Sequence, residues 1–285
     1  MTNLIEARGL AKRFGSTRAL EGVSFSVPEG RIVGLIGPNG AGKTTALKAI
    51  LGLTRFEGEL SVLGQDPYRH RHRVMQDVCF IADVAVLPRW MRVRQLLDFM
   101  AATHPRFRRE VCEQFLSRTD IKRDSRVKEL SKGMITQLHL SLVMAVDAKL
   151  LVLDEPTLGL DLLMRKQFYD TLLSEYFDGQ RTIVVTTHQV EEIEHILTDL
   201  LFIDRGRIVL DAAMEDLQER YVQLAVRPDK VEAARALKPI AERAGLGRTQ
   251  MLFRDVPRET LAGLGDTGVP SVADLFVAII QGARS

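Results

Sequence analysis

The chain is poor in several features that define other classes of protein. It has two cysteines, Cys79 and Cys112, among 285 residues, too few for a disulfide framework. We expect both thiols to be buried as small apolar side chains. Its 39 basic and 37 acidic side chains leave a formal charge of +2, which excludes a strongly basic nucleic-acid binder on composition. We therefore expect no nucleic-acid partner.

Long apolar runs are also absent from the sequence. No run is long enough to span a bilayer, and the first residues lack the apolar segment of a secretory signal peptide. With 46% hydrophobic and 27% charged residues, the composition is that of a folded protein. We expect a cytoplasmic chain that reaches a membrane only through a partner.

From residue 130 onward, the hydrophobic pattern alternates between predicted helices and strands. Apolar runs at 150–153, 182–186 and 200–204 predict buried strands. The segments between them predict helices at 161–176 and 190–197. This alternation is typical of a parallel sheet in an α/β protein.

The remaining segments flank this α/β region. Residues 4–35 predict short strands separated by turns, and about 66–129 predict a helical arm, because apolar side chains recur there at helical spacing. After about residue 212, the pattern changes to that of a small α+β appendage. We predict one domain over 2–212, which includes the helical arm, and an accessory region over 213–285.

A glycine-rich segment follows the apolar run at 31–36. Residues 37–45 read Gly-Pro-Asn-Gly-Ala-Gly-Lys-Thr-Thr, which matches G-x-x-x-x-G-K-[ST] ahead of a predicted helix. Glycines let backbone N–H groups surround a phosphate, and a helix N-terminus adds free donors and a favourable dipole. Lys43 would neutralise the β- and γ-phosphates, and Thr44 would bind Mg²⁺. The residues predicted to bind ATP are Gly37, Pro38, Asn39, Gly40, Ala41, Gly42, Lys43, Thr44 and Thr45.

Two carboxylates end the predicted strand at 150–153. Ligands of parallel sheets gather at the carboxyl ends of the strands, so Asp154 and Glu155 are expected near the glycine-rich segment. Asp154 would hold Mg²⁺, directly or through water, because hard cations prefer oxygen ligands. Glu155 would polarise the attacking water as a general base.

Together these motifs resemble the ATP-binding subunits of ABC transporters, which have a P-loop NTPase core with an N-terminal antiparallel β subdomain. Residues 130–134 (Leu-Ser-Lys-Gly-Met) are similar to the family's LSGGQ signature, and 157–161 (Thr-Leu-Gly-Leu-Asp) resemble its D-loop. His188 follows a strand at the position of the switch histidine. Phe14 occupies the position where the family stacks an aromatic ring on adenine, although a core role for Phe14 remains an alternative.

The resemblance implies a mechanism in which two subunits pair head to tail, as a homodimer, with ATP between them. Each ATP would contact one subunit's phosphate loop and the other subunit's signature, here Ser131, Lys132, Gly133 and Met134. Asp161 would act as the D-loop residue. His188 would contact the γ-phosphate and hold the water in line with Glu155. An integral membrane permease would be the further partner, so the chain would sit on the cytoplasmic face of the membrane.

Two positions depart from the family pattern. Lys132 and Met134 replace the usual glycine and glutamine of the signature, and similar signatures occur in ATPases of exporter-type systems. Aligning 78–83 with the family's Q-loop places Asp83 where glutamine is usual. Asp83 is thus a candidate Mg²⁺ ligand, and the alternative is a loop acid without contact to the metal.

Three functions fit these motifs. We expect the energy-coupling ATPase of a membrane exporter. A soluble ABC ATPase that acts on ribosomes or DNA is the alternative, but such proteins usually carry two cassettes or a long coiled coil. An inactive regulatory module is suggested by Asp83 alone, and the intact Lys43, Asp154, Glu155 and His188 argue against it.

Overall fold

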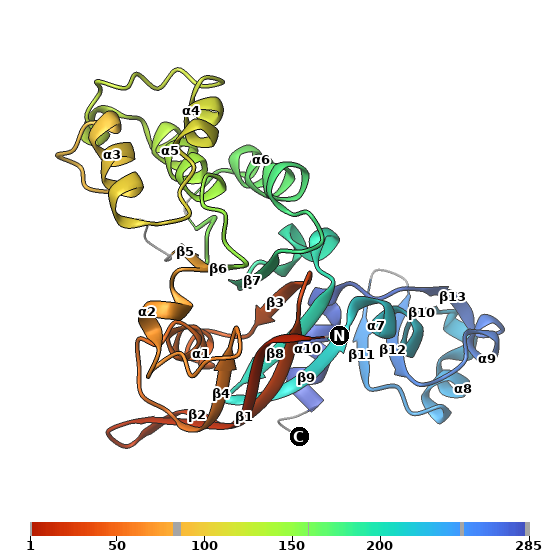
Figure 1. The fold of residues 1–285 in the computed structure, drawn as a ribbon. Helices are drawn as coiled ribbons and strands as arrows, with labels where there is room; N and C mark the ends of the chain where they lie inside the picture. The colour runs from red at the N-terminus through yellow and green to blue at the C-terminus, as the bar shows by residue number, and fades with distance from the viewer. Residues whose placement is uncertain (1, 82–86, 159, 246–247, 283–285) are drawn as a thin grey trace.

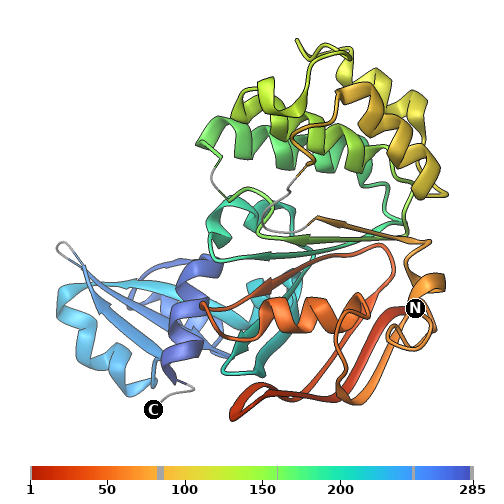
Figure 2. The ribbon, with the colours of Figure 1, turned by 90° about the vertical axis from the view of Figure 1, so that its left-hand side faces the viewer.

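The computed structural model describes residues 2–81, 87–158, 160–245 and 248–282. Within these ranges, the chain forms a six-stranded, a three-stranded and a four-stranded sheet. Figure 1 shows a lobe of helices above the six-stranded sheet and the C-terminal elements to its right, and Figure 2 shows the same arrangement from the side.

The six-stranded central sheet consists mainly of fully buried strands. Its members, in spatial order, are β5 (Val78–Ile81), β6 (Leu150–Asp154), β7 (Thr182–Thr187), β3 (Ile32–Ile36), β8 (Asp199–Asp204) and β9 (Arg207–Ala213). The first five are parallel and β9 is antiparallel. Every residue of β3, β6 and β7 is buried, which accounts for their largely apolar sequences. Since these strands are parallel, their carboxyl ends meet at one edge of the sheet.

The three-stranded sheet is antiparallel and lies beside the central sheet. It has the order β2 (Thr17–Pro28), β1 (Asn3–Phe14), β4 (Glu57–Val62). Apolar side chains from this sheet, from α1 (Lys43–Ile50) and from the central sheet form one buried cluster. The predicted N-terminal antiparallel β region is therefore confirmed, and its packing helps to fix the start of α1.

The helical lobe consists of α3 (Val93–Thr103), α4 (Arg109–Leu116) and α5 (Lys132–Met144), which share a separate buried cluster. The expectation of helix over 66–129 is wrong at its start, because α2 (Arg71–Val74) is one turn and β5 is a strand of the central sheet. A four-residue apolar run is too short to show a period, and pairing with β6 makes it a strand.

The C-terminal region combines strands and helices, as expected. Its elements are α7 (Met214–Arg220), β10 (Tyr221–Val226), α8 (Val231–Ala236), β11 (Ala241–Ala244), β12 (Thr249–Arg254), α9 (Arg258–Ala262), β13 (Gly265–Gly268) and α10 (Val272–Gly282). The four strands form an antiparallel sheet with its own apolar cluster. However, α10 packs into the main core, where Phe276 meets Phe202 edge to face. The domain boundary between residues 212 and 213 stays a prediction from the sequence.

Two predicted helices have a different form in the structure. The segment 161–176 begins as α6 (Leu162–Thr171) and ends in a π-helical turn, η2 (Leu172–Tyr176). The segment 190–197 forms two short 3₁₀ turns, η3 (Val190–Glu192) and η4 (Glu194–Ile196), in place of the predicted helix. Hydrogen bonds from Ile193 and Ile196 reach back three residues, the 3₁₀ pattern. Among the described residues, no helix is long and apolar enough to cross a membrane.

Candidate ATP-hydrolysis site

The glycine-rich segment forms the connection between β3 and α1. Gly40 and Gly42 have φ angles of 80° and 113°, which L side chains rarely adopt. At Gly37, a Cβ atom would lie 2.3 Å from the carbonyl oxygen of Ile203 in β8. The loop therefore requires glycine at these positions, and it leads directly into the first turn of α1, where backbone N–H groups point out of the helix.

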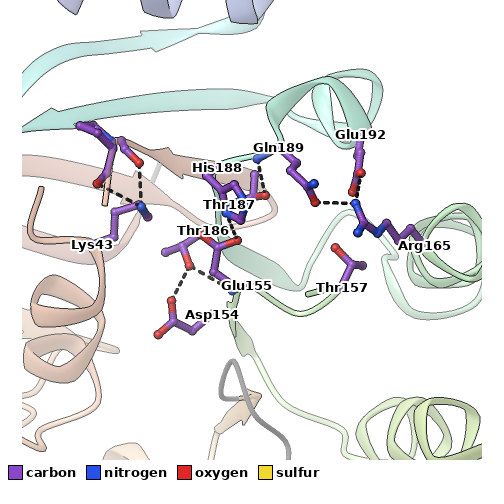
Figure 3. Close-up of polar contacts among 12 residues, drawn as sticks. Lys43, Asp154, Glu155, Thr157, Arg165, Thr186, Thr187, His188, Gln189 and Glu192 are labelled. Carbon is purple, nitrogen blue, oxygen red and sulfur yellow. Dashed lines mark hydrogen bonds and ion pairs between the residues drawn. The ribbon is translucent and has the colours of Figure 1, made fainter. Parts of the chain in front are cut away.

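Lys43 is buried inside this loop. Its Nζ donates hydrogen bonds to the carbonyl oxygens of Gly37 (2.6 Å) and Pro38 (3.3 Å), as Figure 3 shows. Burial lowers the pKa of Lys43, and the negative charges of Glu155 and Asp154 oppose that shift. The structure thus brings the lysine of the loop close to both carboxylates at the end of β6.

The end of β6 is held by a buried threonine of the neighbouring strand β7. The hydroxyl of Thr186 donates to Oδ1 of Asp154 at 2.6 Å, and both side chains are buried. The backbone N–H of Glu155 faces the backbone oxygen and the hydroxyl of Thr186 at 3.1 and 3.2 Å. Glu155 itself has a φ of 49°, a strained conformation for a residue with a side chain. These contacts fix the direction in which the Glu155 carboxylate points.

The carboxylate of Glu155 meets the ring of His188. Oε2 of Glu155 lies 2.9 Å from Nδ1 of His188, the residue that follows β7. The Glu155 side chain is 15% exposed and the His188 side chain is 42% exposed. The pair thus lies at the carboxyl ends of β6 and β7, with the His188 ring partly open to solvent (Figure 3). A carboxylate in contact with an imidazole suits transfer or orientation of a proton on a bound water.

The predicted signature lies in the helical lobe, away from the phosphate loop. Ser131 caps α5, and its hydroxyl accepts a hydrogen bond from the Met134 N–H at 3.2 Å. Figure 1 places α5 and α1 on opposite sides of β5 and β6. Asp161 caps α6 in the same way, accepting from the Met164 N–H at 2.9 Å. Ser131 and Asp161 are therefore both helix N-caps within one copy of the chain.

The other predicted site residues have different outcomes. Phe14 is 53% exposed, so it is not a core aromatic, and the Lys12 ammonium lies 5.0 Å from its ring centroid. Asp83 lies outside the described residues. Thr44 is exposed and Thr45 is partly buried, next to Lys43 at the start of α1.

Sequence reasoning missed residues whose side chains contact the site residues or the neighbouring loops and hold them in position. Thr186 had a usable signal, because it ends a buried strand next to Asp154 in the predicted sheet. Arg165 of α6 had no such signal, because its contacts with Gln189 and Glu192 join segments 24 and 27 residues apart in the sequence. Tyr169 was also missed; its hydroxyl lies 3.3 Å from that of Thr157, and burial raises its pKa.

Residues 20–158 match the ABC transporter family. Over 275 residues, the chain is 34% identical to Nod factor export ATP-binding protein I of Ralstonia nicotianae, an alignment that covers 92% of this chain and 85% of that protein. The chain belongs to the ABC transporter ATP-binding family. The protein is thus the ATP-binding subunit of an ABC transporter, and it is an ATPase whose hydrolysis of ATP is coupled to transport.

Other comparisons agree with this assignment. The ABC transporter ATP-binding protein YtrB of Bacillus subtilis is 27% identical over 252 residues, covering 87% of this chain and 86% of that protein. A solved structure titled as the ATP binding subunit of an ABC transporter superposes with a TM-score of 0.67 at 25% identity, covering 75% of this chain and 92% of the other. The predicted P-loop NTPase fold is confirmed.

Proposed function

We propose that this ABC ATPase powers an exporter. Seven of the relatives compared carry the name Nod factor export ATP-binding protein I, and the alignments of the first five extend over 91–93% of this chain. The permease would be an integral membrane protein, and this subunit would bind it on the cytoplasmic face. The observation that carries the proposed chemistry is the 2.9 Å contact between Glu155 and His188 beside Lys43.

In the proposed reaction, Glu155 acts as the general base toward the water that attacks the γ-phosphate of ATP. The Nδ1 contact holds the His188 ring against Glu155, so that the ring aligns that water and contacts the γ-phosphate. Lys43 and the N–H groups of the loop around Gly40 and Gly42 stabilise the phosphate charge. Phe14, exposed at the end of β1, offers a face for the adenine ring.

The residues at this edge fit a Mg²⁺ ion. Thr44 is exposed, and Thr186 fixes one of the two carboxylate oxygens of Asp154. Hydroxyl and carboxylate oxygens are the hard donors that Mg²⁺ prefers. Thr44 and Asp154 would hold the ion, which neutralises phosphate charge when it is bound. Asp83, the third candidate ligand, stays a prediction from the sequence.

A second copy of the chain would complete the site. Ser131 caps α5, and Lys132, Gly133 and Met134 form its first turn. The Ser131 hydroxyl and the backbone N–H groups of Lys132 and Gly133 would bind the γ-phosphate of the partner's ATP. A Cβ atom at Gly133 would find its nearest neighbour at 3.8 Å, an ordinary contact. The fold of one copy therefore does not require glycine there, which suits close approach by a ligand. Asp161 would lie at the same interface.

Isolation of the chain from membranes tests the exporter proposal. We expect tagged protein to recover one multi-spanning membrane protein, and that protein, reconstituted in lipid, should stimulate ATP hydrolysis. Lys43→Ala is the matched control, because it should keep the partner but abolish ATP binding and stimulation. Recovery of ribosomes or DNA in place of a membrane protein would contradict the proposal and favour a soluble ABC ATPase.

A further inference from the structure

Arg165 joins the two loops that flank the Glu155–His188 pair. It lies in the first turns of α6, whose N-cap is Asp161. Its Nε donates to the carbonyl oxygen of Leu160 at 2.8 Å, and its Nη1 donates to Oε1 of Gln189 at 2.5 Å. The same Nη1 forms an ion pair with Glu192 in η3. Figure 3 shows Arg165 reaching from α6 to the turn that carries Gln189 and Glu192.

The Arg165 contact is largely withdrawn from solvent. The side chains of Arg165 and Glu192 are each 18% exposed. The second carboxylate oxygen of Glu192 is buried, and it has no hydrogen-bond partner in the part of the chain that the structure describes. Removing the guanidinium would leave this carboxylate with its charge uncompensated in a poorly hydrated position. The ion pair therefore constrains where the 188–192 turn can lie.

Each loop held by Arg165 is also connected to one member of the catalytic pair. On one side, the Leu158 N–H bonds to the Glu155 carbonyl oxygen at 3.1 Å, and the Leu160 N–H bonds to that of Thr157 at 3.0 Å. On the other side, Gln189 follows His188 in the chain, and its N–H bonds to the Thr187 hydroxyl at 2.9 Å. A shift of either loop would therefore move one side chain of the pair relative to the other.

We propose that Arg165 is a positioning residue for hydrolysis: it fixes the 188–192 turn to Leu160 and so holds His188 against Glu155. The inference rests on the proposed roles of Glu155 and His188. Within the described residues, the side-chain hydrogen bonds of Arg165 reach Leu160, Gln189 and Glu192, and none reaches the phosphate loop or the start of α5. Its loss should therefore leave ATP binding intact and slow the chemical step.

The test is a double-mutant cycle between Arg165 and His188, measured by single-turnover ATP hydrolysis with enzyme in excess. Arg165→Met keeps the length of the side chain but removes its donors. We expect it to lower the hydrolysis rate about 10- to 100-fold, the range for a misplacement of about 1 Å, with ATP affinity within about twofold. In a His188→Ala background, the same substitution should change the rate by less than about twofold.

Two further variants separate positioning from folding. Arg165→Lys keeps a cation beside Glu192 but lacks the planar fork that reaches Leu160 and Gln189 together, so its rate should fall between those of wild type and Arg165→Met. Arg118→Met is the matched control: the Nη1 of Arg118 donates to both carboxylate oxygens of Glu175 near the surface, and its loss should leave the rate unchanged.

The outcomes distinguish the inference from the proposed function. Loss of rate by the same factor in both backgrounds would overturn the positioning role of Arg165 and leave the roles of Glu155 and His188 intact. If ATP affinity in Arg165→Met fell by the same factor as the hydrolysis rate, the positioning role of Arg165 would also be overturned. A wild-type rate for His188→Ala alone would overturn the role proposed for His188, and with it this inference.

Discussion

The hydroxyl of Thr186 supports Asp154, and Thr186→Val tests that support with little change of shape. Thr186 is fully buried, and its hydroxyl donates to Oδ1 of Asp154 at 2.6 Å. A hydrogen bond to a charged group contributes about 1.5–3 kcal/mol, so the free energy of unfolding should fall by about that amount. The same bond orients Asp154, a proposed metal ligand. In Thr186→Val, the Mg²⁺ concentration for half-maximal hydrolysis should therefore rise about 10- to 100-fold, or the maximal rate of hydrolysis should fall by the same factor.

Thr182→Val is the matched control at the other end of β7. Thr182 is also fully buried, but its hydroxyl accepts from the backbone N–H of Gly30 at 3.0 Å, a neutral partner. Its loss should cost about 0.5–1.5 kcal/mol and leave the Mg²⁺ dependence of hydrolysis unchanged. Urea unfolding, monitored by circular dichroism, gives the free energy of unfolding. A Mg²⁺ titration of the ATPase activity gives the Mg²⁺ dependence. The reasoning would be refuted if Thr186→Val and Thr182→Val lost the same free energy of unfolding. An unchanged Mg²⁺ dependence of hydrolysis in Thr186→Val would also refute it.

Three further predictions follow from other sites. Gly37→Ala should abolish binding of a fluorescent ATP analogue, because its Cβ would lie 2.3 Å from the Ile203 oxygen; wild-type affinity would contradict this. Burial raises the pKa of the Cys79 and Cys112 thiols to about 12, so labelling by iodoacetamide at pH 8 should be slow in the folded protein and rapid in urea; fast labelling of the folded chain would oppose it. Burial lowers the pKa of His139 to about 4, so its contribution to stability should be present above about pH 6.5 and be lost as the pH falls toward 4. Urea midpoints at pH 7 and pH 5 should differ less in His139→Gln than in wild type.

The parts of the site that come from one continuous segment could be predicted from the sequence. The phosphate loop needs glycines and a lysine at fixed spacing between a strand and a helix, and residues 37–45 supply them. Asp154 and Glu155 could be placed near Lys43 because parallel strands end at a common edge. The structure brings these groups together as expected.

Features set by contacts between distant segments could not be predicted. The strand β5 depends on its pairing with β6, and the turns after His188 depend on packing rather than on periodicity. The partners of Arg92 and Arg94 could not be predicted either: Arg92 donates to the carbonyl oxygen of Asp124, and Arg94 pairs with the Asp124 carboxylate at 3.3 Å. Charge reversal there would therefore disturb the helical lobe itself as well as any partner contact.

The central claim is that Glu155 is the base in a site completed by a second copy of the chain. Glu155→Gln, which keeps the shape of the side chain but removes its charge, should bind ATP and accumulate as a dimer in size-exclusion chromatography with light scattering. Glu191→Gln, the same change at an exposed acid of the same turn as His188, should hydrolyse ATP and elute as wild type does. A Glu155→Gln protein that turns over ATP at the wild-type rate, or stays monomeric with ATP, would contradict the account.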